Sequence, residues 1–321
     1  MVTGAASAHH DPQVLVPYGG PEPDPAYLDV FVYLRPESNG VEVESAVLSV
    51  IQHCAEYRSG INLIYLANVP GDYIVRNRII ERHYATRLFF GVHGGSAFSS
   101  DMKRQFELFY GVPFEQDRVI GAFEALRRFE WDPEELFRLW VENDALVHIA
   151  GQNIKRYNGI YIVNYDVPAL LHKNNAGTDI AVMAFRTREG YPHFFHLAHQ
   201  MRSTLVERGL LRQGVPIARA VHISRSPFEQ LIDTRDYLIR QDGSPATPAD
   251  SSFGRYLLDR AVPLAVVQGF MDHPICEFDF GEGLPRDQSL LELCEGFNYE
   301  DCLHMLPMIR SQLTAPGSPF L

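Results

Sequence analysis

The chain has 321 residues, 46% hydrophobic and 21% charged, which is enough apolar sequence for one large domain or two of medium size. A formal net charge of -12 argues against a protein that binds nucleic acid by neutralising phosphates. No run approaches the roughly 18 uninterrupted apolar residues of a membrane-spanning helix, so no membrane contact is expected. Four cysteines in so long a chain form no disulfide framework, and reduced thiols in the cytoplasm are the expectation.

The N-terminal region is rich in alanine, serine, histidine, proline and glycine, which predicts a disordered leader over residues 1–25. It has neither the basic nor the apolar region of a secretory signal. A folded segment is then expected over residues 26–158. Two apolar, β-branched runs in it, Tyr27–Leu34 and Ile61–Val69, predict strands of one sheet, and apolar residues at helical spacing lie between them.

The rest of this segment is predicted to be largely helical. We expect a helix from about Asp72 to Phe89, followed by a loop rich in glycine and serine over residues 91–100. Ser99 or Ser100 can cap the next helix, and residues 118–125 fit either a strand or a helix. Asp132 followed by Pro133 predicts the start of a helix that ends near residue 143.

The strand–helix order recurs in a second segment, residues 159–240. Strands are predicted over residues 159–167, 178–186 and 217–224, and helices over residues 193–211 and 226–240. We therefore predict an α+β fold, a ferredoxin-like α/β sandwich whose mainly antiparallel sheet carries its helices on one face. The predicted fold could also include a second half that contains a βαβ unit.

Composition changes again after residue 240. Residues 241–252 (QDGSPATPADSS) predict a flexible linker. The remaining residues, 253–321, are expected to form a helix over residues 256–271 and an acidic C-terminal segment.

One short motif resembles the active-site segment of nucleoside diphosphate kinases, in which G-R-N-x-x-H carries the histidine that accepts the phosphoryl group. Gly151, Gln152 and Asn153 stand where Gly, Arg and Asn would, and Arg156 stands where the histidine would. Three further matches occur in the family's order: Leu34-Arg35-Pro36-Glu37 for I-K-P-D, His83-Tyr84 with Arg87-Leu88-Phe89-Phe90 for H-Y and R-P-F-F, and Val119–Ala125 for an apolar strand.

The resemblance covers residues 27–159 and implies a nucleotide-kinase-like fold without phosphoryl transfer by that route. A guanidinium keeps its proton in proteins, so Arg156 cannot attack phosphorus. The family's H-G-S-D run is also absent, and Gln152 replaces an arginine. Nucleoside diphosphate kinase activity is therefore not predicted.

Two groups of residues are predicted to bind a ligand. Arg35, Lys155 and Arg156 could jointly bind an anion such as a nucleotide phosphate, with Asn153 and Tyr84 as hydrogen-bond partners. The alternative is that these residues are surface charges that flank strands.

The second group is the polar turn of residues 172–179, between two predicted strands, in which Lys173 and Asn174 are candidate ligand contacts. Asparagine and glycine there could equally supply turn geometry.

A metal site is the weaker possibility. His193, His196 and His199 recur every third residue and could join His222, but apolar residues between them favour an amphipathic packing helix. No metal is therefore predicted, and the cofactor is left open.

These observations favour a non-catalytic module that senses a nucleotide or binds a protein partner. The alternative is an enzyme that acts on a phosphorylated small molecule, with or without a metal, whose catalytic group lies in residues 172–179 or 193–199. The expected partners are a nucleotide or another phosphorylated small molecule, a protein, or a second copy of the chain.

Overall fold

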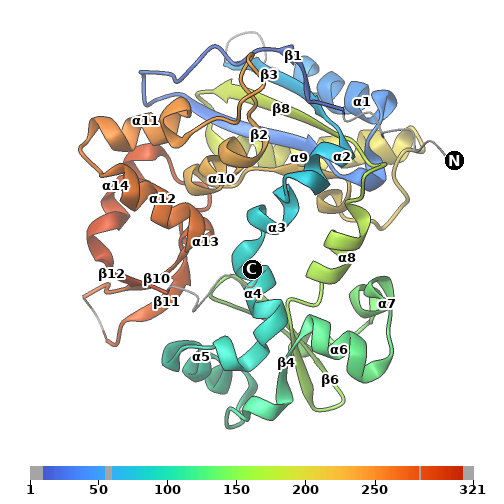
Figure 1. Ribbon diagram of the computed structural model, residues 1–321, viewed down its shortest axis with the longest axis vertical. Helices are drawn as coiled ribbons and strands as arrows, with labels where there is room; N and C mark the ends of the chain where they lie inside the picture. Colours follow the sequence, from blue (N-terminus) through green and yellow to red (C-terminus); the bar gives the residue numbers. More distant parts are fainter. Residues whose placement is uncertain (1–9, 55–59, 282, 314–321) are drawn as a thin grey trace, which may run out of the picture.

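The computed structural model describes residues 10–54, 60–281 and 283–313. These residues form a five-stranded, a four-stranded and a three-stranded sheet, with helices around each of them (Figure 1). The predicted α+β class is confirmed. No helix in the described ranges is long and apolar enough to cross a membrane.

The main sheet is antiparallel throughout and brings together distant parts of the chain. Its order is β1-β3-β8-β2-β9, with the bounds β1 Gln13–Val16, β2 Leu28–Leu34, β3 Ile61–Val69, β8 Ile180–Thr187 and β9 Val221–Ile223. The two strands predicted from the first segment, β2 and β3, do lie in one sheet. They are not neighbours, because β8 pairs with both of them.

Two helices cross one face of this sheet. Helix α1 (Val41–His53) connects β2 to β3, and α9 (Gly190–Glu207) connects β8 to β9. The chain therefore runs β-α-β–β-α-β through the sheet, with a long excursion over residues 70–179 between the two halves. Assignment to the ferredoxin-like sandwich stays a prediction. Both helices bury apolar stripes against the sheet: Val43, Ala46, Val47, Val50 and Ile51 on α1, and Tyr191, Phe194, Leu197, Met201 and Leu205 on α9.

The prediction of helices on one face only is wrong, because the opposite face is also covered. Helices α2 (Gly71–Arg76) and α3 (Ile79–His83) and the end of α10 (Pro227–Tyr237) pack there against a second apolar cluster. Every residue of β2 is buried. Strands covered on both faces read as continuous apolar runs rather than alternating ones, which is the pattern of the LDVFVYL sequence of β2.

The excursion folds around the four-stranded sheet, of order β4-β7-β6-β5. Its elements are α4 (Ala85–His93), α5 (Ser100–Tyr110), β4 (Val119–Gly121), α6 (Ala122–Phe129), α7 (Pro133–Arg138), β5 (Leu146–Ile149), β6 (Gln152–Tyr157), β7 (Ile160–Val163) and α8 (Val167–Lys173). Residues 118–125, which fitted a strand or a helix, contain β4 and the start of α6.

Two predicted boundaries in this region differ from the structure. The expected helix over residues 72–89 is three helices, because Arg78 has a left-handed backbone with φ 50° between α2 and α3. The predicted segment boundary at residues 158 and 159 falls in the β6–β7 hairpin. Asn158 and Gly159 both have positive φ there, 48° and 73°, as a tight hairpin turn requires.

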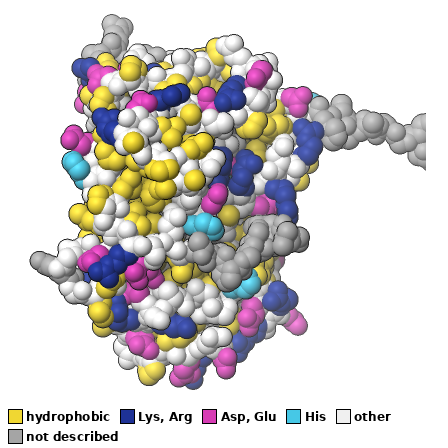
Figure 2. All heavy atoms as spheres, turned by 60° about the vertical axis from the view of Figure 1, so that its left-hand side comes forward, with side chains coloured by type: hydrophobic (Ala, Val, Ile, Leu, Met, Phe, Trp, Pro, Cys, Tyr) yellow, Lys and Arg dark blue, Asp and Glu magenta, His cyan; other side chains and the backbone are white. Residues whose placement is uncertain are grey.

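The C-terminal residues form the three-stranded sheet, of order β11-β10-β12, and its helices. The elements are α11 (Ser252–Asp259), α12 (Leu264–Asp272), β10 (Ile275–Phe278), β11 (Arg286–Ser289), α13 (Leu290–Leu293), α14 (Tyr299–Met305) and β12 (Ile309–Gln312). The predicted helix over residues 256–271 is interrupted at Ala261, whose φ is 61°. Figure 2 shows apolar side chains gathered on the face that these elements help to form.

Parts of the predicted leader and linker form regular structure. Residues 1–9 lie outside the described residues, but β1 in residues 10–25 pairs with β3. In the expected linker, Asp250 and Thr247 form a capping box, and Ile239 makes a β-bridge to Pro245. Proline, glycine, aspartate and serine therefore supply turns and caps in this linker rather than flexibility.

A buried ion pair ties several of these segments together. Asp29 of β2 is 1% exposed and accepts Nε of Arg186 from β8 at 2.8 Å. The same carboxylate accepts the hydroxyls of Tyr18 at 2.7 Å and Ser252 at 2.6 Å. One carboxylate thus connects the N-terminal region, the adjacent strands β2 and β8 and the start of α11.

Loss of this pair is expected to destabilise the fold strongly. We predict that Arg186→Met lowers the free energy of unfolding by about 3–5 kcal/mol, because it leaves Asp29 charged and buried without its main partner. Arg188→Met is the matched control, since Arg188 pairs with Asp24 at 2.9 Å where both side chains are exposed, and it should cost less than about 1 kcal/mol. Urea unfolding measures both; equal losses would contradict the assignment.

Candidate functional site

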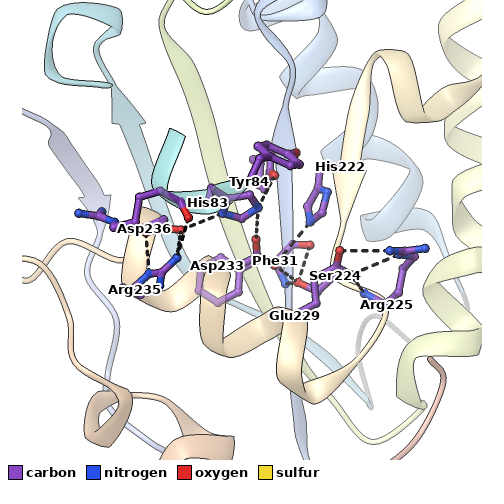
Figure 3. Close-up of polar contacts among 12 residues, drawn as sticks. Phe31, His83, Tyr84, His222, Ser224, Arg225, Glu229, Asp233, Arg235 and Asp236 are labelled. Carbon is purple, nitrogen blue, oxygen red and sulfur yellow. Dashed lines mark hydrogen bonds and ion pairs between the residues drawn. The ribbon is translucent and has the colours of Figure 1, made fainter. Parts of the chain in front are cut away.

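The second face of the main sheet carries a cluster of buried charges (Figure 3). Ser226 caps the N-terminus of helix α10, and its hydroxyl accepts a hydrogen bond from the backbone N–H of Glu229 at 3.2 Å. Asp233 and Asp236 lie three residues apart on this helix and therefore share a face. Both carboxylates are fully buried, and His83 from α3 lies between them.

His83 is held by Asp236. Its Nδ1 lies 3.0 Å from the Asp236 carboxylate, which also accepts Arg82 at 2.6 Å and Arg235 at 3.0 Å. Burial by itself lowers the pKa of His83, but the hydrogen bond to Asp236 and the charges of neighbouring groups outweigh it and raise the pKa to about 9. His83 is therefore an imidazolium at neutral pH.

Asp233 has fewer partners. Its Oδ2 accepts the Ser224 hydroxyl at 2.7 Å and lies 3.5 Å from Nε2 of His222, and its Oδ1 lies 3.8 Å from Nε2 of His83. The His222 ring stacks on Tyr33, with ring centroids 4.2 Å apart. This side of the cluster therefore joins β2, β9 and α10.

Tyr84 forms the outer edge of the cluster, where α3 meets α4. Its hydroxyl accepts Nη1 of Arg35 at 3.2 Å, and its ring lies edge-on to His83 with centroids 4.7 Å apart. Burial opposes ionisation of the phenol, but the positive charges of Arg35 and His83 outweigh it and lower the pKa of Tyr84.

Tyr84 and Arg35 face a cavity of about 300 Å³, which we call the basic pocket. Four cationic side chains from different elements line it: Arg35 after β2, Arg87 on α4, Lys173 on α8 and Arg219 before β9. Its charged lining also includes Asp166, and the remaining wall is mostly apolar, made of Phe137, Ala169, Leu170, Pro216 and Ala218.

Two carboxylates partly balance these cations. Asp166 accepts two hydrogen bonds from Nη2 of Arg87, at 2.8 and 2.7 Å. Glu134 of α7 lies 2.8 Å from Nζ of Lys173 and 4.0 Å from Arg219. Among the described residues, the lining of the basic pocket itself holds four cationic side chains and the carboxylate of Asp166.

A second cavity, of about 520 Å³, lies beyond Tyr84 and Arg87, which line both. We call it the junction pocket, because the excursion, α10 and the C-terminal elements meet there. His148 of β5 bridges two of these parts, with Nδ1 2.7 Å from Oδ1 of Asn153 and Nε2 2.6 Å from the Glu292 carboxylate of α13.

The structure brings together some of the predicted site residues. Arg35, Tyr84 and Lys173 all line the basic pocket. Asn153 lines the junction pocket instead, and Asn174 lines a hole of about 10 Å³ beside Tyr84 and Tyr33.

The predicted group of Arg35, Lys155 and Arg156 does not form. Lys155 and Arg156 are neighbours on β6 and so point to opposite faces of its sheet. Lys155 is 3% exposed and donates to the backbone carbonyls of Phe137 and Leu139 at the end of α7, and burial lowers its pKa to about 8. Arg156 pairs with Asp144 at 3.2 Å.

Other contributors were missed from the sequence. Arg219 lies in a run predicted as a strand, and Arg87 was noted only for the family resemblance. Their shared surroundings depend on contacts between distant segments, such as that of Arg87 with Asp166. The spacing of Asp233 and Asp236 was the available signal for the buried cluster, since it places two acids on one face of a predicted helix.

The histidines considered for a metal do not converge. His193, His196 and His199 lie on α9, whereas His222 stacks on Tyr33 at the opposite face of the main sheet. Within the described ranges, no group of three histidine, cysteine or acidic side chains could hold a metal ion.

In comparisons with known proteins, no family model, curated protein or solved structure matches the chain.

The buried imidazolium predicts a specific dependence of stability on pH. Because the pKa of His83 is about 9 when folded and about 6.5 when unfolded, its contribution is complete below pH ~6.5 and is lost as the pH rises through 9. The shift in the pKa of His83 contributes on the order of 3 kcal/mol to the free energy of unfolding.

We expect wild type to lose stability between pH ~6.5 and ~9.5 and His83→Gln to show a flatter profile over that range. His53→Gln, at an exposed position, should keep the wild-type profile. Urea unfolding at several pH values measures this difference, and parallel profiles for wild type and His83→Gln would contradict it.

Proposed function

We propose that the protein binds a phosphorylated small molecule, such as a nucleotide, in the basic pocket and acts as a ligand-sensing regulatory module. The observation that carries this proposal is the position of Arg35. Its guanidinium donates to the Ala218 carbonyl at 3.0 Å and to the Tyr84 hydroxyl, and it makes no ion pair with a carboxylate of the described residues. A positive charge left in this way at a cavity wall favours an anion.

The other walls of the pocket support the same ligand class. Lys173 and Arg219 add cationic side chains to its lining, whereas the whole chain has a net charge of -12. Phe137, Leu170 and Pro216 offer apolar surface for a carbon skeleton or a base. The volume is at the lower end of ligand sites, roughly 300–1,000 Å³, which favours a molecule no larger than a mononucleotide.

The resemblance to nucleoside diphosphate kinases stays a prediction. Arg35 stands where that family's phosphate-contacting lysine would and lines the basic pocket together with Tyr84. Arg156, which replaces the nucleophilic histidine, makes its ion pair with Asp144 instead. The proposal therefore rests on the pocket rather than on the motif around Arg156.

An enzyme that acts on a phosphorylated small molecule is the second candidate. The observation in its favour is that two groups with shifted pKa values, His83 and Tyr84, border the pockets. Such groups concentrate at catalytic sites, although structural ion pairs shift pKa values as well.

Ligand binding is testable by thermal shift and calorimetry with ADP, glycerol 3-phosphate and inorganic phosphate. At least one should raise the melting temperature of wild type. Arg35→Gln and Arg219→Gln should each weaken binding by about 10- to 100-fold, since each removes a charge-assisted contact of about 1.5–3 kcal/mol.

Arg156→Gln is the matched control, because it removes the same charge away from the pocket and should leave the affinity unchanged. No shift of wild type with any of the three compounds at millimolar concentration would refute the proposal. So would an equal loss of affinity in Arg35→Gln and Arg156→Gln.

A further inference from the structure

Glu134 of α7 is not part of the lining of the basic pocket, but it contacts two of the cations that are. Its Oε1 lies 2.8 Å from Nζ of Lys173, and its Oε2 lies 4.0 Å from Nη2 of Arg219. The Phe137 ring, three residues farther along α7, lies beside the same cations, with Nζ of Lys173 5.7 Å and Cζ of Arg219 4.3 Å from its centroid. Glu134 therefore pairs with cations of the wall at which the proposed ligand would bind.

Ion pairs alone hold the Glu134 carboxylate. Both of its oxygens are buried, and neither accepts a hydrogen bond from the described residues. A further ion pair joins it to Nη2 of Arg138 at 3.2 Å, but the Arg138 side chain is 73% exposed, so solvent weakens this contact. A buried carboxylate without hydrogen bonds recovers only part of the free energy that it loses on leaving water. Glu134 is therefore the carboxylate that an incoming anion can displace most easily.

Asp166, the carboxylate within the lining, is held differently. It accepts two hydrogen bonds from Nη2 of Arg87, at 2.8 and 2.7 Å, and a third from Nδ2 of Asn153 at 3.3 Å. An anion that displaced Asp166 would have to replace these hydrogen bonds as well as the ion pair. The contrast assigns Arg87 to the fixed framework of the pocket and leaves Lys173 and Arg219 for exchange.

This inference rests on the proposed function and concerns the regulation and the ligand class of the same site. We propose that Glu134 is an internal competitor of the ligand. Without ligand it holds Lys173 and Arg219, and it gives them up to the phosphoryl group of a molecule anchored at Arg35. The phosphoryl group of a monoester brings two negative charges to these cations in exchange for one. A phosphodiester brings one charge in exchange for one and gains little, so the pocket selects phosphate monoesters.

Two pairs of compounds test the ligand class, each a monoester and its cyclic diester. They are AMP with cyclic AMP, and glycerol 3-phosphate with glycerol 1,2-cyclic phosphate. At pH ~8 the monoesters carry two charges on the phosphoryl group and the diesters one. Calorimetry should show that wild type binds at least one monoester, and binds it about 10-fold or more tightly than its cyclic diester.

Glu134→Gln tests the competition, because the amide has the same shape but no charge with which to hold the cations. The variant should bind the monoester and its diester each about 5- to 10-fold more tightly than wild type. Glu142→Gln is the matched control, since it makes the same change at an exposed position outside the lining and should leave both affinities unchanged.

A double variant separates competition for the cations from a general repulsion between Glu134 and the ligand. In a Lys173→Gln background the main partner of Glu134 is gone. Adding Glu134→Gln should then improve monoester binding by clearly less than it does in wild type. An equal improvement in the two backgrounds would show that Glu134 only repels the ligand, and would refute the exchange.

The remaining outcomes separate this inference from the proposed function. If Glu134→Gln binds the monoester no more tightly than wild type, the competition is refuted and the binding function stands. If a cyclic diester binds wild type as tightly as its monoester, or if only ADP or inorganic phosphate binds, the selection of monoesters is refuted and the binding function again stands. If wild type binds none of these compounds, the proposed function fails and this inference fails with it.

Discussion

The pairing of Val69 with Ile180 constrains the whole architecture. These residues end β3 and begin β8, and they are neighbours in the main sheet although the excursion separates them in sequence. The chain must therefore leave and return at one place. Asp179 accepts the backbone N–H of Gly71 at 3.1 Å, and a Cβ atom on Gly71 would lie 2.3 Å from the Asn175 carbonyl oxygen, so only glycine fits there.

Buried charge links this architecture to the basic pocket. Removing two carboxylates and an imidazolium from water is costly, and it is tolerated because each carboxylate receives donors from other elements. Asp236 joins α10 to Arg82 and His83 of α3, and Asp233 joins α10 to Ser224 after β9. The residue after His83 is Tyr84, so the ion pairs that hold α3 also fix one wall of the pocket.

Local sequence signals predicted most of the main sheet. The apolar runs of β2, β3 and β8 can be recognised in the sequence because strands covered on both faces contain few polar residues. The same feature hid the fact that both faces are covered, since a continuous apolar run does not show what packs on either side. The places where β8 inserts and where helices break depend on distant contacts and on single backbone conformations, such as that of Arg78.

The candidate site was predictable only in part. Arg35, Tyr84 and Lys173 stand out as polar residues beside apolar elements, and the structure groups them. Lys155 and Arg156 looked equally suitable, yet the two-residue period of a strand sends them to different surroundings. A single sequence does not reveal contacts between residues that are far apart in the chain. The surroundings of four residues depend on such contacts: Arg87, Arg219, Asp233 and Asp236.

The contact of Arg87 Nη2 with both carboxylate oxygens of Asp166 closes the base of the excursion, because it joins α4 to the start of α8. The basic pocket borders this closure and shares both of its residues. Other lining residues of the pocket come from two parts of the chain, Ala218 and Arg219 from the segment before β9 and Phe137 and Lys173 from the excursion. A molecule seated in the pocket would therefore contact both parts at once, and its binding would oppose their separation.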